Sequence, residues 1–374
     1  LSGVWIMAYT TIDDPSAHFQ TLKYTGNGSN PRNLTNEGNS NLKPDFLWGK
    51  NLTDAGTNNI ITNTTLGLDP ANTASLLSSD SDAGVNTPNP TYGYVSAMLT
   101  DGFTAAAGGT NGDNFNANSK EFAAWQWKAT GGTTSSNSDG GITTTIQANT
   151  DSGVSIVFYT GDGATGQTVG HGLGKVPKFI MSKDRDATSN VPGWRCYHEA
   201  LGATKYIDLH QDSYASTFTD WNNTTPTSSV YSIGGSGGYR PTNTSSTEYI
   251  AFVFAEVQGF SKIGSYIGNG NANGPFIYTG FKPAWVLIKA DSNYKYWYIF
   301  DNKMDTINQI DTGVSPSNTF ADNTNTNIGL DFLSNGFKIR NNATTLNQSS
   351  ITCIFMAFAE NPFVSSTGIP TTAR

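Results

Sequence analysis

Three related copies of one segment recur along the chain, and this internal repeat constrains the fold more than any other feature. Each copy has, in order, an aromatic residue that ends a strand-like segment, a Gly-Asn-Gly or Gly-Asp-Gly turn, a proline, an apolar segment and a lysine. The copies begin at Tyr24, Tyr159 and Tyr266. A short aromatic segment that favours β-structure closes each copy: residues 122–128, 249–256 and 353–360.

The length of the repeat indicates three domains rather than small stacked units. Tyr159 follows Tyr24 by 135 residues, and Tyr266 follows Tyr159 by 107. A period above about 100 residues is longer than a solenoid repeat or a propeller blade. Only 13% of the residues are charged, aromatic residues reach 12%, and 40 glycines supply turns, which is typical of short strands joined by many loops. We therefore predict an all-β chain of three tandem jelly-roll-like, concanavalin-like β-sandwich domains.

The predicted domain boundaries follow the copies and the low-complexity stretch between the first two. Glycine, serine and threonine dominate residues 130–141, which have little to bury. We expect domains 2 and 3 to be fixed relative to one another, because almost no linker separates them, and domains 1 and 2 to hinge. Met7 is expected to be the natural first residue, because the six residues before it are too few for a signal peptide. The predicted parts are an N-terminal segment (1–18), three sandwiches (19–129, 153–260 and 261–363), a linker (130–152) and a C-terminal tail (364–374).

Charge, hydropathy and cysteine usage argue against several classes of protein. The formal net charge is −8 and no basic run occurs, whereas nucleic-acid binding needs clustered lysine and arginine. No stretch of 18 apolar residues is present, so we predict no membrane span. Cys196 and Cys353 occupy unrelated positions in different copies. We therefore expect two free thiols in the core rather than a disulfide or a metal site.

No group of residues points to catalysis, a cofactor or a metal. The Gly-Asp-Gly and Gly-Asn-Gly turns lack the helix and the lysine that follow a phosphate-binding loop. Asp184 and Asp186 lie two residues apart in a loop, which favours solvated turn residues over the carboxylate pair of a glycoside hydrolase. No histidine has another histidine at a ligand-like spacing. We expect turn-capping or exposed side chains at His18, His171, His198 and His210.

Aromatic residues in polar loops are the candidates for ligand binding. Such loops resemble sugar-binding surfaces, where aromatic rings stack on apolar sugar faces and amides bond to hydroxyl groups. The alternative is that these rings cap cores or fill contacts between subunits. The candidates are Trp221, Tyr239, Tyr294 and Tyr296.

Several segments together resemble a repeat of tailed-phage structural proteins. That repeat is frequent in marine and cyanobacterial phages, in virion proteins labelled as tail fibres, and its strand order is similar to that of concanavalin-like jelly rolls. The resemblance covers nearly the whole chain from Met7 onward and is weaker in the middle of domain 1. The segments that carry it are residues 9–20 with 24–28, residues 170–177 with 194–198, and the closing segments 249–256 and 355–362.

The resemblance implies a non-enzymatic bacteriophage virion protein of the tail-fibre or receptor-binding type. Such a protein would be made in the host cytoplasm without a signal peptide, lie on the virion surface and bind a host cell-surface receptor, with a saccharide as the expected ligand. Its partners would be other virion proteins, and fibre proteins that resemble it favour a homo-oligomer, in particular a trimer. The alternative is a structural head-decoration or fibre-shaft subunit that binds only other virion proteins. A polysaccharide depolymerase is disfavoured because no carboxylate pair stands out.

Overall fold

The computed structural model is built almost entirely of antiparallel strands. It describes residues 9–68, 76–81, 92–108, 114–186, 193–234, 242–292, 294–324 and 328–370. Within these ranges the helical structure is limited to short 3-10 turns, of which η1 (Pro15–Ala17) is capped by the side chain of Asp14. The predicted all-β class is confirmed. Met7 and Tyr239 lie outside the described residues.

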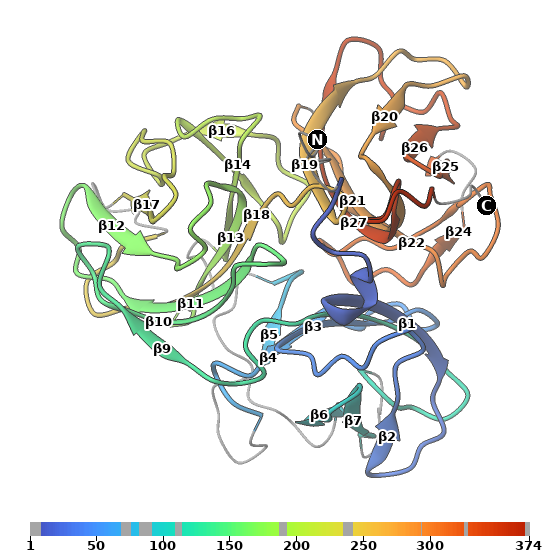
Figure 1. Cartoon of the computed structure of the whole chain (residues 1–374), viewed down its shortest axis with the longest axis horizontal. Coiled ribbons are helices and arrows are strands. Elements are labelled where there is room, and N and C mark those ends of the chain that lie inside the picture. Colours follow the sequence, from blue (N-terminus) through green and yellow to red (C-terminus); the bar gives the residue numbers. More distant parts are fainter. Residues whose placement is uncertain are drawn as a thin grey trace, which may run out of the picture.

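Three large sheets share one strand order. The first strand of each repeat pairs with the last strand, and the last strand pairs with the strand that contains or directly follows the proline of the repeat. Each sheet defines a unit, coloured blue to teal, green to yellow, and orange to red along the chain in Figure 1. Unit 1 (residues 19–129) has β1 (Phe19–Thr25), β8 (Glu121–Trp127), β3 (Phe46–Asn51), β4 (Ile60–Asn63) and β5 (Leu76–Ser78). Unit 2 (residues 130–260) has β11 (Val154–Thr160), β18 (Glu248–Ala255), β13 (Pro177–Asp184), β14 (Trp194–His198), β15 (Lys205–Asp208) and β16 (Ser216–Thr217), with β10 (Thr144–Asn149) and β9 (Ser135–Asn137) beside β11. Unit 3 (residues 261–363) has β19 (Ser261–Ile267), β27 (Thr352–Pro362), β21 (Phe281–Ala290) and β22 (Tyr298–Asp301).

A small sheet covers one face of each large sheet and makes the unit a β-sandwich. Each pair of sheets encloses its own apolar cluster, built from residues such as Phe103 in unit 1, Tyr231 in unit 2 and Phe337 in unit 3. Whether each unit folds as a separate jelly-roll domain stays a prediction. The small sheets are β2 (Arg32–Leu34), β7 (Phe103–Ala106) and β6 (Tyr94–Met98) in unit 1; β12 (Gln167–Gly170) and β17 (Val230–Ile233) in unit 2; and β20 (Phe276–Tyr278), β26 (Gly336–Ile339) and β25 (Leu330–Leu333) in unit 3, which also has the pair β23 (Thr312–Gly313) and β24 (Asn323–Thr324).

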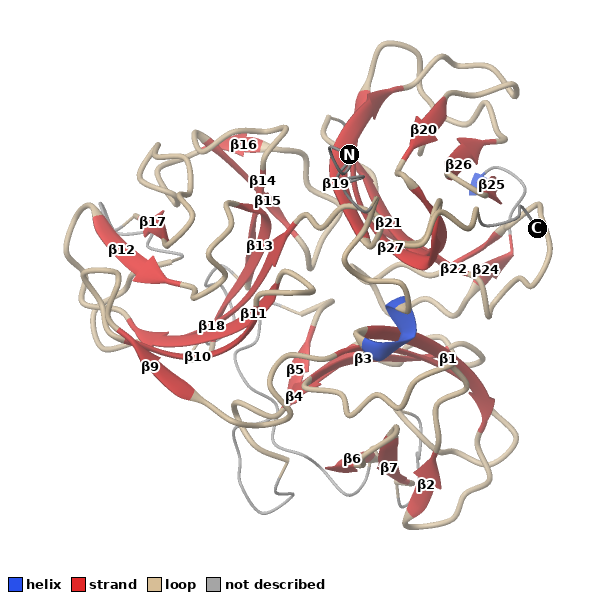
Figure 2. Ribbon diagram, in the orientation of Figure 1, coloured by secondary structure: helices blue, strands red, loops and turns tan. Residues whose placement is uncertain are grey.

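The other faces of the three large sheets pack against one another in the middle of the molecule, while the small sheets lie at its periphery (Figures 1 and 2). Trp127 of β8 is central to this shared core. Its ring lies 4.6 Å from that of Phe46 in unit 1, 6.4 Å from Phe254 in unit 2, and 5.5 and 5.6 Å from Trp285 and Phe358 in unit 3. The large sheets are therefore buried on both faces, which explains their nearly continuous apolar sequences.

Hydrogen bonds at equivalent positions close the three units into a ring. Trp194 Nε1 of unit 2 donates to the Ser78 carbonyl of unit 1 at 2.8 Å, and Trp297 Nε1 of unit 3 donates to the Asp208 carbonyl of unit 2 at 2.8 Å. At the equivalent position of unit 1, Asn59 Nδ2 donates to the Asn318 carbonyl of unit 3, also at 2.8 Å. Each unit thus contacts both others through polar bonds as well as through the shared core.

The segment predicted as a flexible linker differs from that expectation. Residues 130–152 contain β9 and β10, and β10 pairs with β11 over five residues. The Asp45 carboxylate of unit 1 accepts from the backbone amides of Ala129 and Gly131 at 2.7 and 2.8 Å. Gln147 of β10 donates to Thr64 of unit 1 at 2.9 Å. These bonds tie the segment to both units.

Each large sheet buries one lysine near the end of the strand that contains or directly follows the proline of the repeat. Lys183 Nζ donates to the Ser81 carbonyl of unit 1, and Lys289 Nζ donates to the Asp212 carbonyl of unit 2, both at 3.1 Å. Lys50 Nζ donates within unit 1. Burial lowers the pKa of Lys50 to about 8 and that of Lys289 to about 7, because the charged ammonium loses its hydration.

Replacing Lys289 with methionine is expected to weaken the rise of stability with pH. The folded pKa of Lys289 lies near 7, below its usual 10.5, so between these values the unfolded chain binds the proton and the folded chain does not. Stability therefore rises with pH across this window, and below it the group contributes no further change. Chemical unfolding at pH 7 and pH 9 should show about 2 kcal/mol more stabilisation in the native chain than in Lys289→Met. Equal changes in the two proteins would contradict the assignment.

Candidate functional site

Two of the predicted ligand-binding residues belong to two separate pairs of aromatic rings, one of which lies at the contact between units 2 and 3. Tyr294 is 67% exposed, and its ring meets that of Tyr214 from unit 2 edge-on at 5.3 Å. Tyr214 is itself 43% exposed. Tyr296 meets Phe320, which is 56% exposed, edge-on at 5.8 Å. We call Tyr214 and Tyr294 the aromatic patch; Tyr296 and Phe320 form a second pair within unit 3.

Backbone contacts between the two units hold the loops that carry the patch. The Ala215 amide of unit 2 donates to the Asp291 carbonyl of unit 3 at 2.8 Å. The buried Lys289 ammonium bonds to the carbonyls of Asp212 and Lys295, one from each loop. The Lys295 side chain in turn donates to Thr344 Oγ1 at 3.1 Å. The two tyrosines that face each other are therefore placed by the packing of the units.

The other two candidates lie elsewhere. Trp221 is only 1% exposed and packs edge-on against Tyr197 and Tyr231 in the core of unit 2. It therefore cannot stack on a ligand at the surface. Its polar neighbours misled the prediction, because Asp220 is also buried, where it pairs with Arg195 at 3.2 Å. Tyr239 lies outside the described residues.

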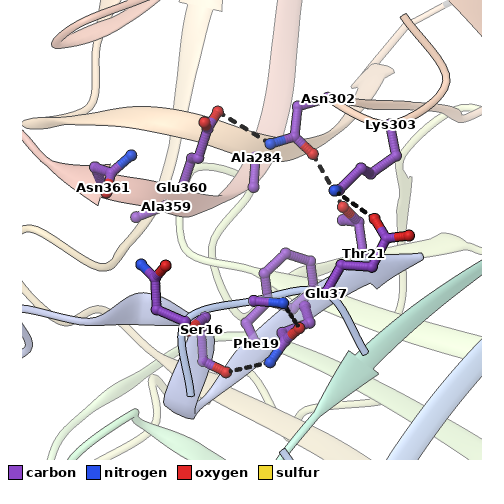
Figure 3. Close-up of a pocket in the computed structure, with 13 residues that line it drawn as sticks. Ser16, Phe19, Thr21, Glu37, Ala284, Asn302, Lys303, Ala359, Glu360 and Asn361 are labelled. Atoms are coloured by element: carbon purple, nitrogen blue, oxygen red, sulfur yellow. Dashed lines mark hydrogen bonds and ion pairs between the residues drawn. The ribbon is translucent and has the colours of Figure 1, made fainter. Parts of the chain in front are cut away.

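A polar cavity of about 330 Å³ lies between units 1 and 3 (Figure 3). Phe19, Ala284 and Ala359 give it an apolar portion, and all three are buried. The remaining lining is polar and comes from β1 with η1, the loop after β2, the start of the β22–β23 connection and the end of β27. These residues are Ser16, Gln20, Thr21, Glu37, Gly38, Asn39, Asn302, Lys303, Glu360 and Asn361.

A chain of hydrogen bonds crosses the cavity wall from unit 1 to unit 3. Thr21 Oγ1 donates to Asn302 Oδ1 at 2.9 Å, and Asn302 Nδ2 donates to Glu360 Oε2 at 3.0 Å (Figure 3). Lys282 pairs with Glu360 at 3.1 Å. On the unit 1 side, Gln20 Nε2 donates to the carbonyls of Ser16 and Ser40, and Gln20 Oε1 accepts from the Gly38 amide. These bonds fix the shape of the cavity.

Two irregularities in the β21–β27 ladder direct side chains into the cavity. Lys282 pairs with Asn361 and Pro283 with Ala359, so Glu360 has no partner residue in the register. The next register shift leaves Ala284 unpaired in the same way. Such bulges change the direction of side chains along a strand. Pro283 is the sequence signal for this feature, because proline cannot donate to the ladder, but the sequence does not show that unit 1 would lie opposite.

The residues considered for catalysis and metal binding have structural roles. Asp184 Oδ1 accepts from the Asp186 amide at 2.9 Å, and Asp186 Oδ2 accepts from the Glu248 amide at 2.9 Å, as turn residues do. His171 Nδ1 accepts from the Leu173 amide at 3.2 Å, which confirms the turn-capping role predicted for it. Among the described residues no group of His, Cys, Asp or Glu could hold a metal ion.

Arg195 forms the most deeply buried ion cluster of unit 2. It pairs with Asp208 and with Asp220, and its guanidinium lies 3.8 Å from the centre of the Tyr206 ring. Burial raises the pKa of Asp220 to about 7, and the nearby Arg195 opposes the rise. This cluster shares no residue with the lining of the 330 Å³ cavity. We assign it to the stability of unit 2.

Comparison with known proteins identifies a family for the chain. A family model described as Domain of unknown function (DUF7483) matches residues 14–362. No curated protein and no solved structure matches the chain. Across the described residues, no helix has the length and apolar character needed to cross a membrane.

Proposed function

The chain belongs to the DUF7483 family, a family of unknown function, and we propose that it is a non-enzymatic bacteriophage virion protein that attaches the particle to a host-cell saccharide through the aromatic patch. The sequence resemblance to tail-fibre proteins supports the virion assignment. The single observation that carries the binding function is the exposure of Tyr214 and Tyr294, which meet across two units.

Aromatic rings at a surface suit the recognition of sugars. Tyrosine offers a flat apolar face and a hydroxyl that stays in water, so it can stack on the apolar face of a sugar ring and still bond to the sugar hydroxyls. An exposed group of large apolar side chains on a soluble protein often marks a binding surface. The Lys295 ammonium and Thr344 hydroxyl beside the patch add hydrogen-bonding groups.

The proposal predicts that Tyr294→Ala and Tyr214→Ala weaken binding to the recognised glycan at least tenfold. Removing a central aromatic contact from an interface commonly costs more than about 1 kcal/mol, and about 1.4 kcal/mol corresponds to tenfold. Tyr92→Ala is the matched control, because Tyr92 is 48% exposed but belongs to unit 1. A glycan array probed with the full chain and the three variants measures the effect.

The outcome separates attachment from a structural role. Binding by the native chain that only the two patch variants lose supports the proposal. Absence of binding to any glycan by the folded chain favours the head-decoration or fibre-shaft alternative, in which virion proteins cover the patch. Binding that all three variants retain would place the glycan site elsewhere on the surface.

A further inference from the structure

We propose that the cavity between units 1 and 3 is a second ligand site, which takes one uncharged, hydroxyl-rich ring of the size of a monosaccharide. The volume of about 330 Å³ falls at the lower end of the range for small-molecule pockets, about 300–1,000 Å³. The site shares no residue with the aromatic patch, so the inference goes beyond the proposed function and does not depend on it.

The charges that border the cavity are already compensated, which favours a neutral ligand. Glu360 pairs with Lys282 at 3.1 Å, and Glu37 pairs with Lys303 at 2.9 Å across the two units (Figure 3). A charged ligand would have to break the partly buried Lys282–Glu360 pair or remain without a counter-ion, and both cost free energy. An uncharged ligand meets neither cost.

Two side-chain amides in the cavity are available for a ligand. Asn39 comes from unit 1 and Asn361 from β27 of unit 3, and within the described residues neither side chain has a hydrogen-bond partner. Each amide offers two donors and one acceptor oxygen, which suits hydroxyl groups that both donate and accept. Phe19, Ala284 and Ala359 line the cavity but are nearly fully buried, so the polar groups offer most of the contact to a ligand. Amides from two units therefore define the ligand class.

The test is a titration of the full chain, followed by NMR, with glucose, galactose and N-acetylglucosamine, and with the charged analogues glucuronate and glucosamine. We expect at least one neutral sugar to bind with a dissociation constant on the order of 1 mM, and its charged analogues to bind at least fivefold more weakly. The double variant Asn39→Ala, Asn361→Ala should lose at least tenfold in affinity. Thermal unfolding of the variant checks that it remains folded.

Tyr294→Ala is the reciprocal control, because it should leave this titration unchanged while it weakens attachment through the patch. The amide double variant should show the opposite pattern, so failure of one proposal is distinguishable from failure of the other. The cavity proposal is overturned if no neutral sugar binds, if charged analogues bind as well as neutral ones, or if the folded amide variant keeps the affinity of the native chain.

Discussion

Replacing Trp127 with alanine is expected to lower the free energy of unfolding by about 4 kcal/mol, in the range for deleting a large buried aromatic side chain. Trp127 is fully buried, and its ring contacts rings of all three units, among them Phe46, Phe254 and Phe358. The cavity left by the substitution would lie where the three large sheets meet. Denaturant unfolding of the native chain and the variant measures the loss.

Hydrogen exchange adds a readout that is specific to the shared core. Trp127→Ala should speed exchange of the Trp194 and Trp297 indole N–H groups. These groups donate across the contact between units 1 and 2 and the contact between units 2 and 3, respectively. Trp221→Ala, which removes a tryptophan from the core of unit 2 alone, is the matched control and should leave the Trp297 indole protected. A loss below about 1 kcal/mol for Trp127→Ala, within the range of ordinary substitutions, would contradict the central role of this ring.

Acid is expected to destabilise the chain through His198, at the contact between units 2 and 3. His198 Nδ1 accepts from the Ala200 amide at 3.1 Å, so Nε2 carries the proton and donates to the Phe355 carbonyl of unit 3 at 3.2 Å. Burial lowers the pKa of His198 from 6.5 to about 4. Between these values the unfolded chain binds a proton and the folded chain does not. Stability is therefore full above pH 6.5 and falls by about 3 kcal/mol as the pH drops to 4.

His198→Asn isolates this effect from other titrating groups. Asn63 stands at the equivalent place in unit 1, opposite Phe46 as His198 is opposite Phe179, so asparagine is compatible with this position in the sheet. Chemical unfolding at pH 7 and pH 4 should show a fall in stability that is about 3 kcal/mol larger for the native chain than for the variant. Parallel pH profiles for the two proteins would rule out His198 as the acid-sensitive group.

The sequence repeat predicted the strand framework well, because the aromatic residues occupy equivalent register positions. Phe46 faces Trp127, Phe179 faces Phe254 and Trp285 faces Phe358 in the three sheets. The opening tyrosines also share one role. In each unit the tyrosine hydroxyl donates to a backbone carbonyl: Tyr24 to Phe115 in unit 1, Tyr159 to Thr242 in unit 2 and Tyr266 to Leu346 in unit 3.

Three buried asparagines escaped sequence reasoning. Each asparagine is the next residue in the sequence after the one whose carbonyl accepts from the opening tyrosine. Its side-chain oxygen accepts from the backbone amide of the central residue of the Gly-Asn-Gly or Gly-Asp-Gly turn, at 3.2, 3.0 and 2.8 Å in units 1, 2 and 3. In a chain rich in asparagine these positions have no distinguishing neighbours, so only the spacing from each closing strand could have found them. The residues are Asn116, Asn243 and Asn347.

The two candidate sites could not be predicted because both form between units. Tyr214 and Tyr294 meet from units 2 and 3, and the cavity joins Asn39 of unit 1 to Asn361 of unit 3. The sequence identifies Tyr294 as an aromatic residue in a polar loop, but it does not show which loop of another unit lies beside it. The error at Trp221 has the same origin, since burial depends on packing that local polarity does not report.

The structure limits the surfaces through which the predicted homotrimer could form. The three large sheets already cover one another within a single chain, so a second copy cannot dock on those faces. An oligomer would have to use peripheral surfaces, such as the edge strand β9, where unpaired backbone groups favour further pairing. The oligomeric state itself stays a prediction.

The most direct test of attachment is the binding of labelled full chain to intact marine bacteria and cyanobacteria, before and after removal of their surface polysaccharide. We predict saturable binding to at least one strain, loss of that binding after the polysaccharide is removed, and loss by the folded double variant Tyr214→Ala, Tyr294→Ala. Binding that persists without the polysaccharide, or in the double variant, would contradict attachment to a saccharide through the aromatic patch.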